Sequence, residues 1–264
     1  MAWLLALDTA GAEGSITLAQ FRDIESDELV ALEEVVLDVR QRHAQVLLPA
    51  IEALLTRLGV KAGEISQVVV TSGPGSFTGL RVGIMCAKTW AYAQRATLVA
   101  IPSLWAIAAT VRDGQISMEP EMSTTPTSPW KQIVVTENAQ RSELFVSRFP
   151  AELPATAEAF LTESQAAIGI ESAESVVRGL QTGDLLTGPG ATLCVGFETG
   201  LTEGQVRAEP RPSGAVLARL GYRLARLGQV SNPMTLEPIY LRRSSAEDKW
   251  LARQADLARA STTM

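Results

Sequence analysis

The first part of the chain alternates between short apolar runs and longer amphipathic patterns. Residues 3–9, 15–21 and 29–37 are typical of strands, and a turn with two glycines between the first two indicates a hairpin. From 44 to 58 apolar residues recur every three or four positions, which predicts a helix ending at Gly59. Further strands are predicted at 68–71 and 98–101, and further helices at 77–92 and 103–111. This order predicts a mixed sheet whose later strands are parallel and covered by helices.

A weaker version of the same order follows residue 130. Strands are predicted at 133–136, 143–149 and 185–187, and a helix capped by Ser213 and ended by Gly228 follows. The segment 113–130 is rich in Pro, Ser, Thr and Met, so a loop or linker is expected there. We therefore expect an α/β fold of two related lobes, the second shortened. The expected division is an N-terminal lobe at 1–112, the loop at 113–130, and a C-terminal lobe with a charged tail at 131–264.

Composition narrows the class of protein. The 264 residues carry a formal net charge of −6 and no long run of basic residues, which argues against a nucleic-acid clamp acting alone. The apolar run that starts the chain has no basic flank and soon meets Asp8, so we interpret it as a strand. No segment has the length of a membrane span, and Cys86 and Cys194 lack paired spacing. These features predict a soluble, cytoplasmic protein without a disulfide framework or a membrane partner.

A glycine-rich turn is the densest signal in the sequence. It comprises Gly73, Pro74, Gly75, Ser76, Phe77 and Thr78, and it connects a predicted strand to a predicted helix. Ser76 or Thr78 can accept main-chain hydrogen bonds at the helix start. Such a start can also bind an anion, because free N–H groups point outward there. A capped strand-to-helix connection accounts for the same residues without any ligand.

The helix after this turn carries a stripe of small residues. Gly79, Gly83, Ala87 and Ala91 recur every four positions, which permits close approach of another backbone. Its remaining sides are apolar, so its own sheet can cover one side and a second side must contact another helix or a partner. We predict an association surface on the helices at 44–58 and 77–92, with Leu80 and Ile84 nominated as facing outward. The residues assigned to that surface are Leu47, Ile51, Gly79, Leu80, Gly83, Ile84 and Ala87.

Catalytic residues are not predicted. The single histidine is His43, and Leu47 stands four positions later, so a pair of metal-binding histidines on one helix face is missing. We therefore expect no transition metal. Ser76 is the best candidate for a nucleophile, but it lacks the nucleophile-elbow sequence.

A second turn raises the question of phosphate binding. Asp8, Thr9 and Gly11 follow the first strand in a pattern that resembles a vestigial phosphate turn, where Asp8 could hold hydrated magnesium. A purely structural Asp–Thr turn is the alternative. No P-loop motif is present, and Gly188, Pro189 and Gly190 are only a faint counterpart of an adenosine loop.

Taken in order, these motifs resemble the TsaB (YeaZ) family. The resemblance rests on Gly73–Gly83, on Leu5–Thr9, on Arg42 and His43 with Leu47–Pro49, and on Pro238 with Tyr240–Arg242. It implies an actin/Hsp70/sugar-kinase-like fold. It also implies a non-catalytic partner subunit that binds a TsaD-type transferase in tRNA threonylcarbamoyladenosine (adenosine 37) modification. A TsaE-type ATPase belongs to the wider complex, tRNA is contacted only through the complex, and the same helices can pair two copies as a homodimer.

The resemblance leaves two alternatives and two departures. A free-standing ATP-using phosphotransferase or hydrolase has the same fold, and the wider family carries the label of glycoprotease-like peptidases. No cofactor is expected to bind tightly, while weak or partner-dependent binding of an adenine nucleotide stays open. The sequence departs from the family at 136–141 and in the long 113–130 loop, which puts details of the second lobe in doubt rather than the helix pair.

Overall fold

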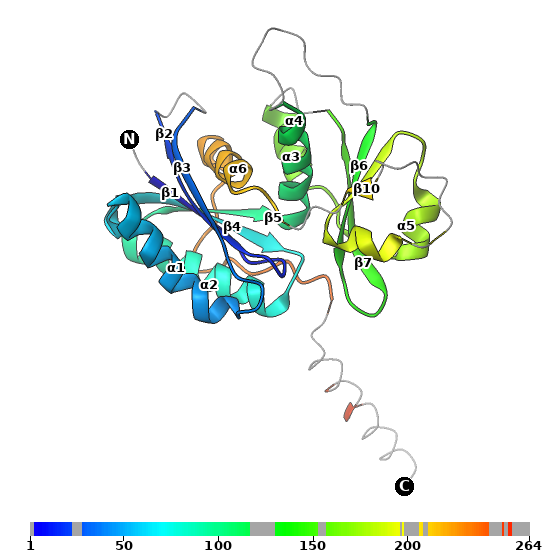
Figure 1. The fold of residues 1–264 in the computed structure, drawn as a ribbon, viewed down its shortest axis with the longest axis horizontal. Helices are drawn as coiled ribbons and strands as arrows, with labels where there is room; N and C mark the ends of the chain where they lie inside the picture. The colour runs from blue at the N-terminus through cyan, green and yellow to red at the C-terminus, as the bar shows by residue number, and fades with distance from the viewer. Residues whose placement is uncertain are drawn as a thin grey trace.

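Two sheets with helices around and between them form the molecule (Figure 1). The computed structural model describes residues 3–22, 28–116, 130–152, 157–195, 197, 206–207, 211–242, 250 and 253–254. Most of the expected 113–130 loop and most of the charged tail lie outside the described residues. Within the described part, no helix is both long and apolar enough to cross a bilayer.

The first sheet has five strands in the order β3-β2-β1-β4-β5. Strand β1 pairs antiparallel with β2 and parallel with β4, which confirms that residues 3–9 and 68–71 share one sheet. Leu5 and Leu7 of β1 join the core on one face, and Leu4 and Ala6 join the core on the other. The sheet is therefore covered on both faces, as its apolar strands predict. Its strands are β1 (Trp3–Asp8), β2 (Ser15–Phe21), β3 (Leu29–Val36), β4 (Ile65–Gly73) and β5 (Thr97–Pro102).

The second sheet repeats this topology in the order β10-β9-β6-β7-β8. In each sheet the first strand pairs antiparallel with the second and parallel with the fourth, and the fifth runs parallel to the fourth. The expectation of two related lobes, the second shortened, is confirmed. The strands are β6 (Gln132–Asn138), β7 (Glu143–Pro150), β8 (Gly169–Ser172), β9 (Asp184–Thr187) and β10 (Val206–Arg207).

Helices α1 (His43–Leu58) and α2 (Phe77–Gln94) cover one face of the first sheet (Figure 1). Helix α6 (Gly214–Arg226) covers the other face and packs against β1, β2 and β5. Helix α6 thus packs on the first lobe, although it comes from the part of the chain expected to form the C-terminal lobe. The division at residues 112 and 131 therefore stays a prediction.

The start of α6 differs from its expected cap. Ser213 is the N-cap residue, but its side chain makes no capping hydrogen bond. Instead Glu34 of β3 accepts a hydrogen bond of 3.2 Å from the amide of Gly214. A carboxylate from a neighbouring strand satisfies an N-terminal amide that a local serine was expected to satisfy.

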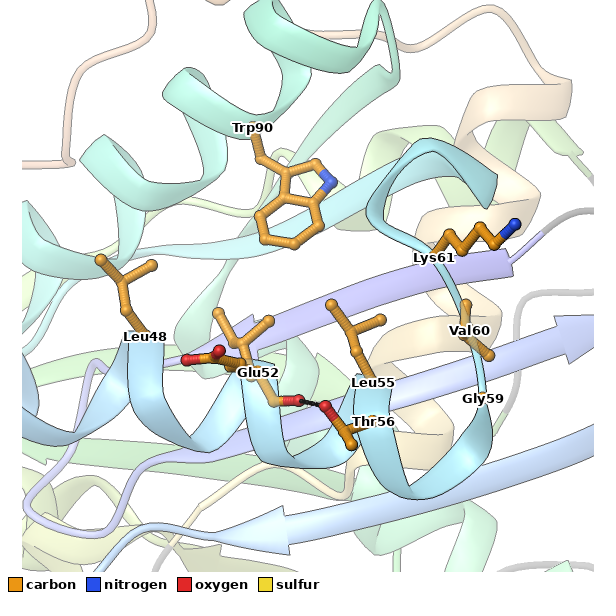
Figure 2. A pocket seen from close by; sticks show the side chains of 9 residues that line it. Leu48, Glu52, Leu55, Thr56, Gly59, Val60, Lys61 and Trp90 are labelled. Carbon is orange, nitrogen blue, oxygen red and sulfur yellow. Dashed lines mark hydrogen bonds between the residues drawn. The ribbon is translucent and has the colours of Figure 1, made fainter.

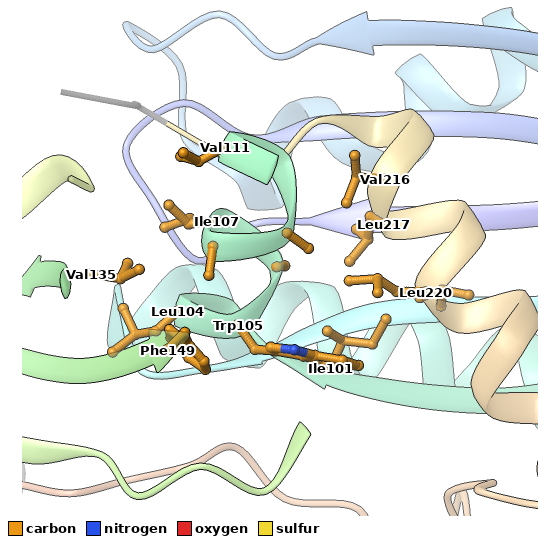
Figure 3. Close-up of a cluster of buried hydrophobic side chains, with 14 of the residues drawn as sticks. Ile101, Leu104, Trp105, Ile107, Val111, Val135, Phe149, Val216, Leu217 and Leu220 are labelled. Atoms are coloured by element: carbon orange, nitrogen blue, oxygen red, sulfur yellow. The ribbon is translucent and has the colours of Figure 1, made fainter. Parts of the chain in front are cut away.

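Helix α3 (Ser103–Ile116) lies between the two lobes. Figure 3 shows its apolar side chains in one cluster with Val216, Leu217 and Leu220 of α6 on one side. Val135 and Phe149 of the second sheet belong to the same cluster. One continuous core therefore joins the lobes.

Several short elements of the second lobe were not predicted. Their apolar patterns are too short to show a period, so sequence alone gave only weak signals there. They are α4 (Ala157–Ser164), α5 (Ala173–Gly179) and the 3₁₀ helix η2 (Pro189–Cys194), while the 3₁₀ helix η1 (Ala62–Glu64) precedes β4 in the first lobe.

Candidate functional site

The glycine-rich turn packs onto the turn that follows β1. The amide of Ser76 donates a hydrogen bond of 2.7 Å to the carbonyl of Ala10. The hydroxyl of Ser76 accepts one of 3.2 Å from the amide of Gly79, which confirms Ser76 as the cap of α2. A Cβ at Gly75 would lie 2.4 Å from the carbonyl oxygen of Ala10, so only glycine fits there.

The stripe of small residues brings α2 against Thr9. A Cβ at Gly79 would lie 2.1 Å from the carbonyl oxygen of Thr9, and one at Gly83 would lie 2.2 Å from its hydroxyl oxygen. Ala87 and Ala91 continue the stripe into the core beneath the sheet. The close approach that the stripe indicates is therefore present, and its partner is a turn of the same chain.

The residues assigned to an association surface lie inside the chain. Gly79 and Gly83 are buried, and Leu47, Ile51, Leu80, Ile84 and Ala87 are each no more than 2% exposed. The nomination of Leu80 and Ile84 as outward-facing is therefore wrong. The sheet and the turn at Thr9 together cover more of the circumference of α2 than a sheet alone would.

Other residues of the same two helices face outward. Leu48 of α1 is 62% exposed, and Met85 and Tyr92 of α2 are 58% and 74% exposed. Met85 and Tyr92 are seven residues apart and so lie on one side of α2. We call Leu48, Met85 and Tyr92 the outer face.

A pocket of about 420 Å³ lies between the two helices next to the outer face (Figure 2). Trp90 projects from α2 toward Leu48 and Leu55 of α1, and Glu52 and Lys61 supply charged groups. Its complete lining is Leu48, Ile51, Glu52, Leu55, Thr56, Gly59, Val60, Lys61 and Trp90. An apolar hollow with a charged edge suits the insertion of an apolar side chain from a partner protein.

Asp8 is fully buried at the end of β1. One carboxylate oxygen accepts hydrogen bonds of 2.7 Å from the Thr71 hydroxyl and 3.1 Å from the Ala10 amide. Burial raises the pKa of Asp8, while these hydrogen bonds and the charges of Arg211 and His43 oppose the rise. The second oxygen has no hydrogen-bond partner among the described residues.

One orphaned oxygen is a feature of a cation ligand, but a metal site needs more than one donor. Within the described ranges, no three His, Cys, Asp or Glu side chains are grouped so that they could hold a metal ion. The described side chains around Asp8 therefore do not form a complete set of metal ligands by themselves, and a hydrated magnesium ion held by Asp8 stays a prediction. Gly11 lies partly buried in the same turn, and the hydrogen bonds of Asp8 and Thr9 serve internal packing.

The second lobe has a counterpart of this turn at Glu137, which the sequence analysis missed. A Cβ at Gly188 would lie 2.3 Å from the carbonyl oxygen of Thr136, and one at Gly190 would lie 3.0 Å from the backbone of Glu137. Glu137 is 9% exposed, and burial raises its pKa to about 7, with the charge of Asp8 adding to the rise. The available signal was its place at the end of β6, which matches the place of Asp8 at the end of β1.

His43 begins α1 and is half-buried beside Gly14 and Gly79. A Cβ at Gly79 would lie 3.2 Å from its Nδ1, and one at Gly14 would lie 3.0 Å from its Nε2. No hydrogen bond joins His43 to Ser76, both of which the structure describes, and the Ser76 hydroxyl is occupied as a helix cap. This arrangement lacks the base contact that a serine nucleophile needs.

Sequence comparison matches part of the chain to known proteins. Residues 36–160 match the family described as "TsaD: tRNA N6-adenosine threonylcarbamoyltransferase". The "tRNA threonylcarbamoyladenosine biosynthesis protein TsaB" of Bacillus subtilis (strain 168) is 34% identical over 43% of this chain and 48% of that protein. The protein of the same description in Escherichia coli (strain K12) is 29% identical over 40% of this chain and 42% of that protein. The chain thus spans about half the length of the curated relatives it matches.

Structural comparison covers nearly the whole chain. The solved structure "YeaZ from Pseudomonas aeruginosa" has a TM-score of 0.68 and 19% identity, covering 91% of this chain and 100% of that one. With the duplicated sheet topology, this likeness shows that the chain is an α/β protein with the same fold as that structure. The partial sequence matches agree with this fold, and over about half of its length the chain is similar to proteins described as TsaB.

Proposed function

We propose that this chain is a non-catalytic partner subunit that binds a TsaD-type transferase and supports it in tRNA threonylcarbamoyladenosine (adenosine 37) modification. The names of the relatives from Bacillus subtilis and Escherichia coli support a role in this pathway. The match to a TsaD family over residues 36–160 includes both α1 and α2, which supports a relationship between this chain and its proposed partner.

The outer face is the observation that carries the proposal. Large apolar side chains on two adjacent helices expose surface that a partner could remove from water. Two helices from a homologous partner would form a four-helix contact with the outer face at its centre. The pocket beside Trp90 would accept a side chain from that partner.

The proposal assigns the chemistry to the partner. The sequence has a single histidine, and Ser76 serves as a helix cap rather than as an activated nucleophile. We propose that the partner supplies metal, nucleotide and most tRNA contacts, with a TsaE-type ATPase in the wider cytoplasmic complex. The isolated chain then holds no metal or nucleotide tightly, and elemental analysis showing one zinc or iron per chain would contradict this.

Two substitutions on the outer face test partner binding. Leu48→Glu and Met85→Glu place a charge on exposed positions, so circular dichroism should match the parent chain. Binding to the TsaD-type transferase of the same organism, measured by calorimetry, should weaken about thirtyfold, which corresponds to about 2 kcal/mol. Ile170→Glu is the matched control, because Ile170 is 39% exposed on β8 in the other lobe.

Three outcomes would contradict the proposal. These are absence of a complex at micromolar concentrations, unchanged binding by both outer-face variants, or equal weakening by Ile170→Glu. Sedimentation of the chain alone over a concentration series separates self-pairing from partner binding, because a homodimer through the same face should be weakened by the same two substitutions.

A further inference from the structure

A strap of irregular backbone, residues 231–242, runs from the first lobe toward the second (Figure 1). It contains Pro238, Tyr240 and Arg242, which contribute to the family resemblance but have no role assigned from the sequence. The strap follows α6, and its contacts lie on both lobes.

Main-chain hydrogen bonds hold the strap to the first sheet at two places. The amide of Ser231 donates a bond of 2.7 Å to the carbonyl of Leu98 on β5. The amide of Ile239 donates one of 2.8 Å to the carbonyl of Ser72 on β4, directly before the glycine-rich turn. The strap is thus fixed to the ends of two parallel strands.

The strap also lies against α2. The rings of Tyr240 and Phe77 have centroids 5.1 Å apart, and Phe77 is the first residue of that helix. Farther along α2, the ammonium group of Lys88 donates a hydrogen bond of 2.9 Å to the carbonyl of Leu236. A shift of α2 would therefore displace the strap through two contacts, one at Phe77 and one at Lys88.

In the second lobe, Arg242 binds the hairpin that joins β6 to β7. Its guanidinium donates hydrogen bonds to the carbonyls of Ala139 and Gln140 and forms an ion pair with Glu143. A planar guanidinium can make all three contacts at once, which an ammonium group cannot reproduce in the same geometry.

The hairpin has an unusual backbone. Gln140, Arg141 and Ser142 have φ angles of 67°, 55° and 63°, a left-handed conformation that residues with side chains rarely adopt. Three consecutive residues in this conformation need external support, because each is disfavoured sterically. Arg242 supplies such support at the two carbonyls that open the turn.

We propose that Arg242 is a latch that holds this hairpin in its strained form and that the strap links the hairpin to α2. The link to α2 implies that docking of the partner on this helix tightens the latch. This part of the proposal rests on the proposed function.

Hydrogen exchange of the isolated chain tests the latch without any partner. Arg242→Ala should speed exchange of the Ala139 and Glu143 amides about tenfold, since both make hydrogen bonds within the hairpin. Arg242→Lys should give an intermediate rate. Arg148→Ala is the matched control, because Arg148 forms a comparable ion pair with Glu171 between β7 and β8.

The control substitution should leave the hairpin amides at the parent rate. Unchanged exchange in Arg242→Ala, or an equal increase in Arg148→Ala, would overturn the latch. Full rescue by Arg242→Lys would also overturn the proposed geometry, because charge alone would then suffice.

Exchange with the TsaD-type transferase present tests the link to docking. Binding should slow exchange at Ala139 and Glu143 in the parent chain, and Arg242→Ala should bind yet lose this protection. A bound complex with unchanged hairpin exchange would overturn the link. If the transferase does not bind the parent chain, the proposed function fails, while the isolated-chain measurement still decides the latch.

Discussion

The hydroxyl of Thr9 donates a hydrogen bond of 2.8 Å to the main-chain carbonyl of Gly79, across 70 residues of sequence. Both groups are buried, so the bond replaces water contacts that each would otherwise lose. It fixes the first turn of α2 against the end of β1. This contact is possible only because position 79 has no side chain.

Gly79→Ala should therefore destabilise the chain. The new Cβ would lie 2.1 Å from a main-chain oxygen, which forces a shift of α2 away from Thr9. We expect a loss of about 2 kcal/mol in the free energy of unfolding, even though alanine favours helix by about 1 kcal/mol over glycine. Urea unfolding monitored by circular dichroism measures it.

Gly63→Ala is the control for that measurement. A Cβ there would have its nearest neighbour, a side-chain oxygen of Gln94, at an ordinary 3.6 Å. Its unfolding midpoint should stay close to that of the parent chain. Equal midpoints for the two variants would show that α2 can move from Thr9 at no cost.

Glu137 should make stability depend on pH. The unfolded carboxyl loses its proton near 4.5, whereas the folded one keeps it until about 7. Between these values the folded chain binds more protons, so stability falls as pH rises and levels off above about 7. Glu137→Gln removes this titration and should raise the free energy of unfolding at pH 8 by about 3 kcal/mol.

Unfolding in urea at pH 5 and pH 8 separates this effect from a general change. At pH 5 the Gln variant should differ little from the parent, because the parent carboxyl is protonated there in the folded state. The stability of Glu137→Gln should still depend somewhat on pH, since burial also raises the pKa of Asp8. Glu174→Gln, at an exposed position on α5, serves as control, and an equal effect of both substitutions would rule out our explanation.

The strands and helices of the first lobe could be predicted because their apolar patterns are long and regular. The stripe at Gly79 and Gly83 likewise indicated close approach, but a stripe does not specify what approaches. Thr9 could not be identified, because the contact spans 70 residues and depends on how β1 ends. A sequence pattern can therefore indicate that a helix makes a close contact, but it does not identify the residue on the other side of that contact.

The exposed side of α2 could not be predicted from the sequence, for a different reason. Leu80, Ile84 and Met85 are all large and apolar, so periodicity does not distinguish them. The structure buries the first two and exposes Met85, because the turn at Thr9 covers an extra side of the helix. Glu137 was missed because its match to Asp8 appears only when the two sheets are compared strand by strand.

The two cysteines should react slowly in the folded chain. Burial raises the pKa of Cys86 to about 11, so its thiol stays protonated at pH 8, and burial also raises the pKa of Cys194. Thiolate is the reactive form, and an ordinary thiol has a pKa of about 8.5, so we expect alkylation of Cys86 to be about a hundredfold slower than in denaturant and alkylation of Cys194 to be slowed as well. Mass spectrometry after iodoacetamide treatment measures this, and rapid labelling of the folded chain would contradict it.

Arg112 and Glu163 form a buried ion pair between α3 and α4, with side chains only 2% and 8% exposed. The guanidinium also donates to the carbonyl of Pro150, and the indole of Trp105 donates to the same carboxylate at 3.3 Å. Every member of this cluster would be left with an unmet charge or hydrogen bond if one partner were removed.

Arg112→Met should therefore cost about 3 kcal/mol or more in the free energy of unfolding, because Glu163 would stay buried without its countercharge. The double variant Arg112→Met with Glu163→Met should recover most of this loss, since no charge is then buried. Arg178→Met is the control, because Arg178 pairs with Glu174 on the exposed side of α5 and such pairs contribute about 0.5 kcal/mol or less. Two outcomes would contradict this prediction: Arg112→Met lowers the free energy of unfolding no more than the control does, or the double variant is less stable than Arg112→Met. Either would show that the packing of α4 on α3 does not depend on this ion pair.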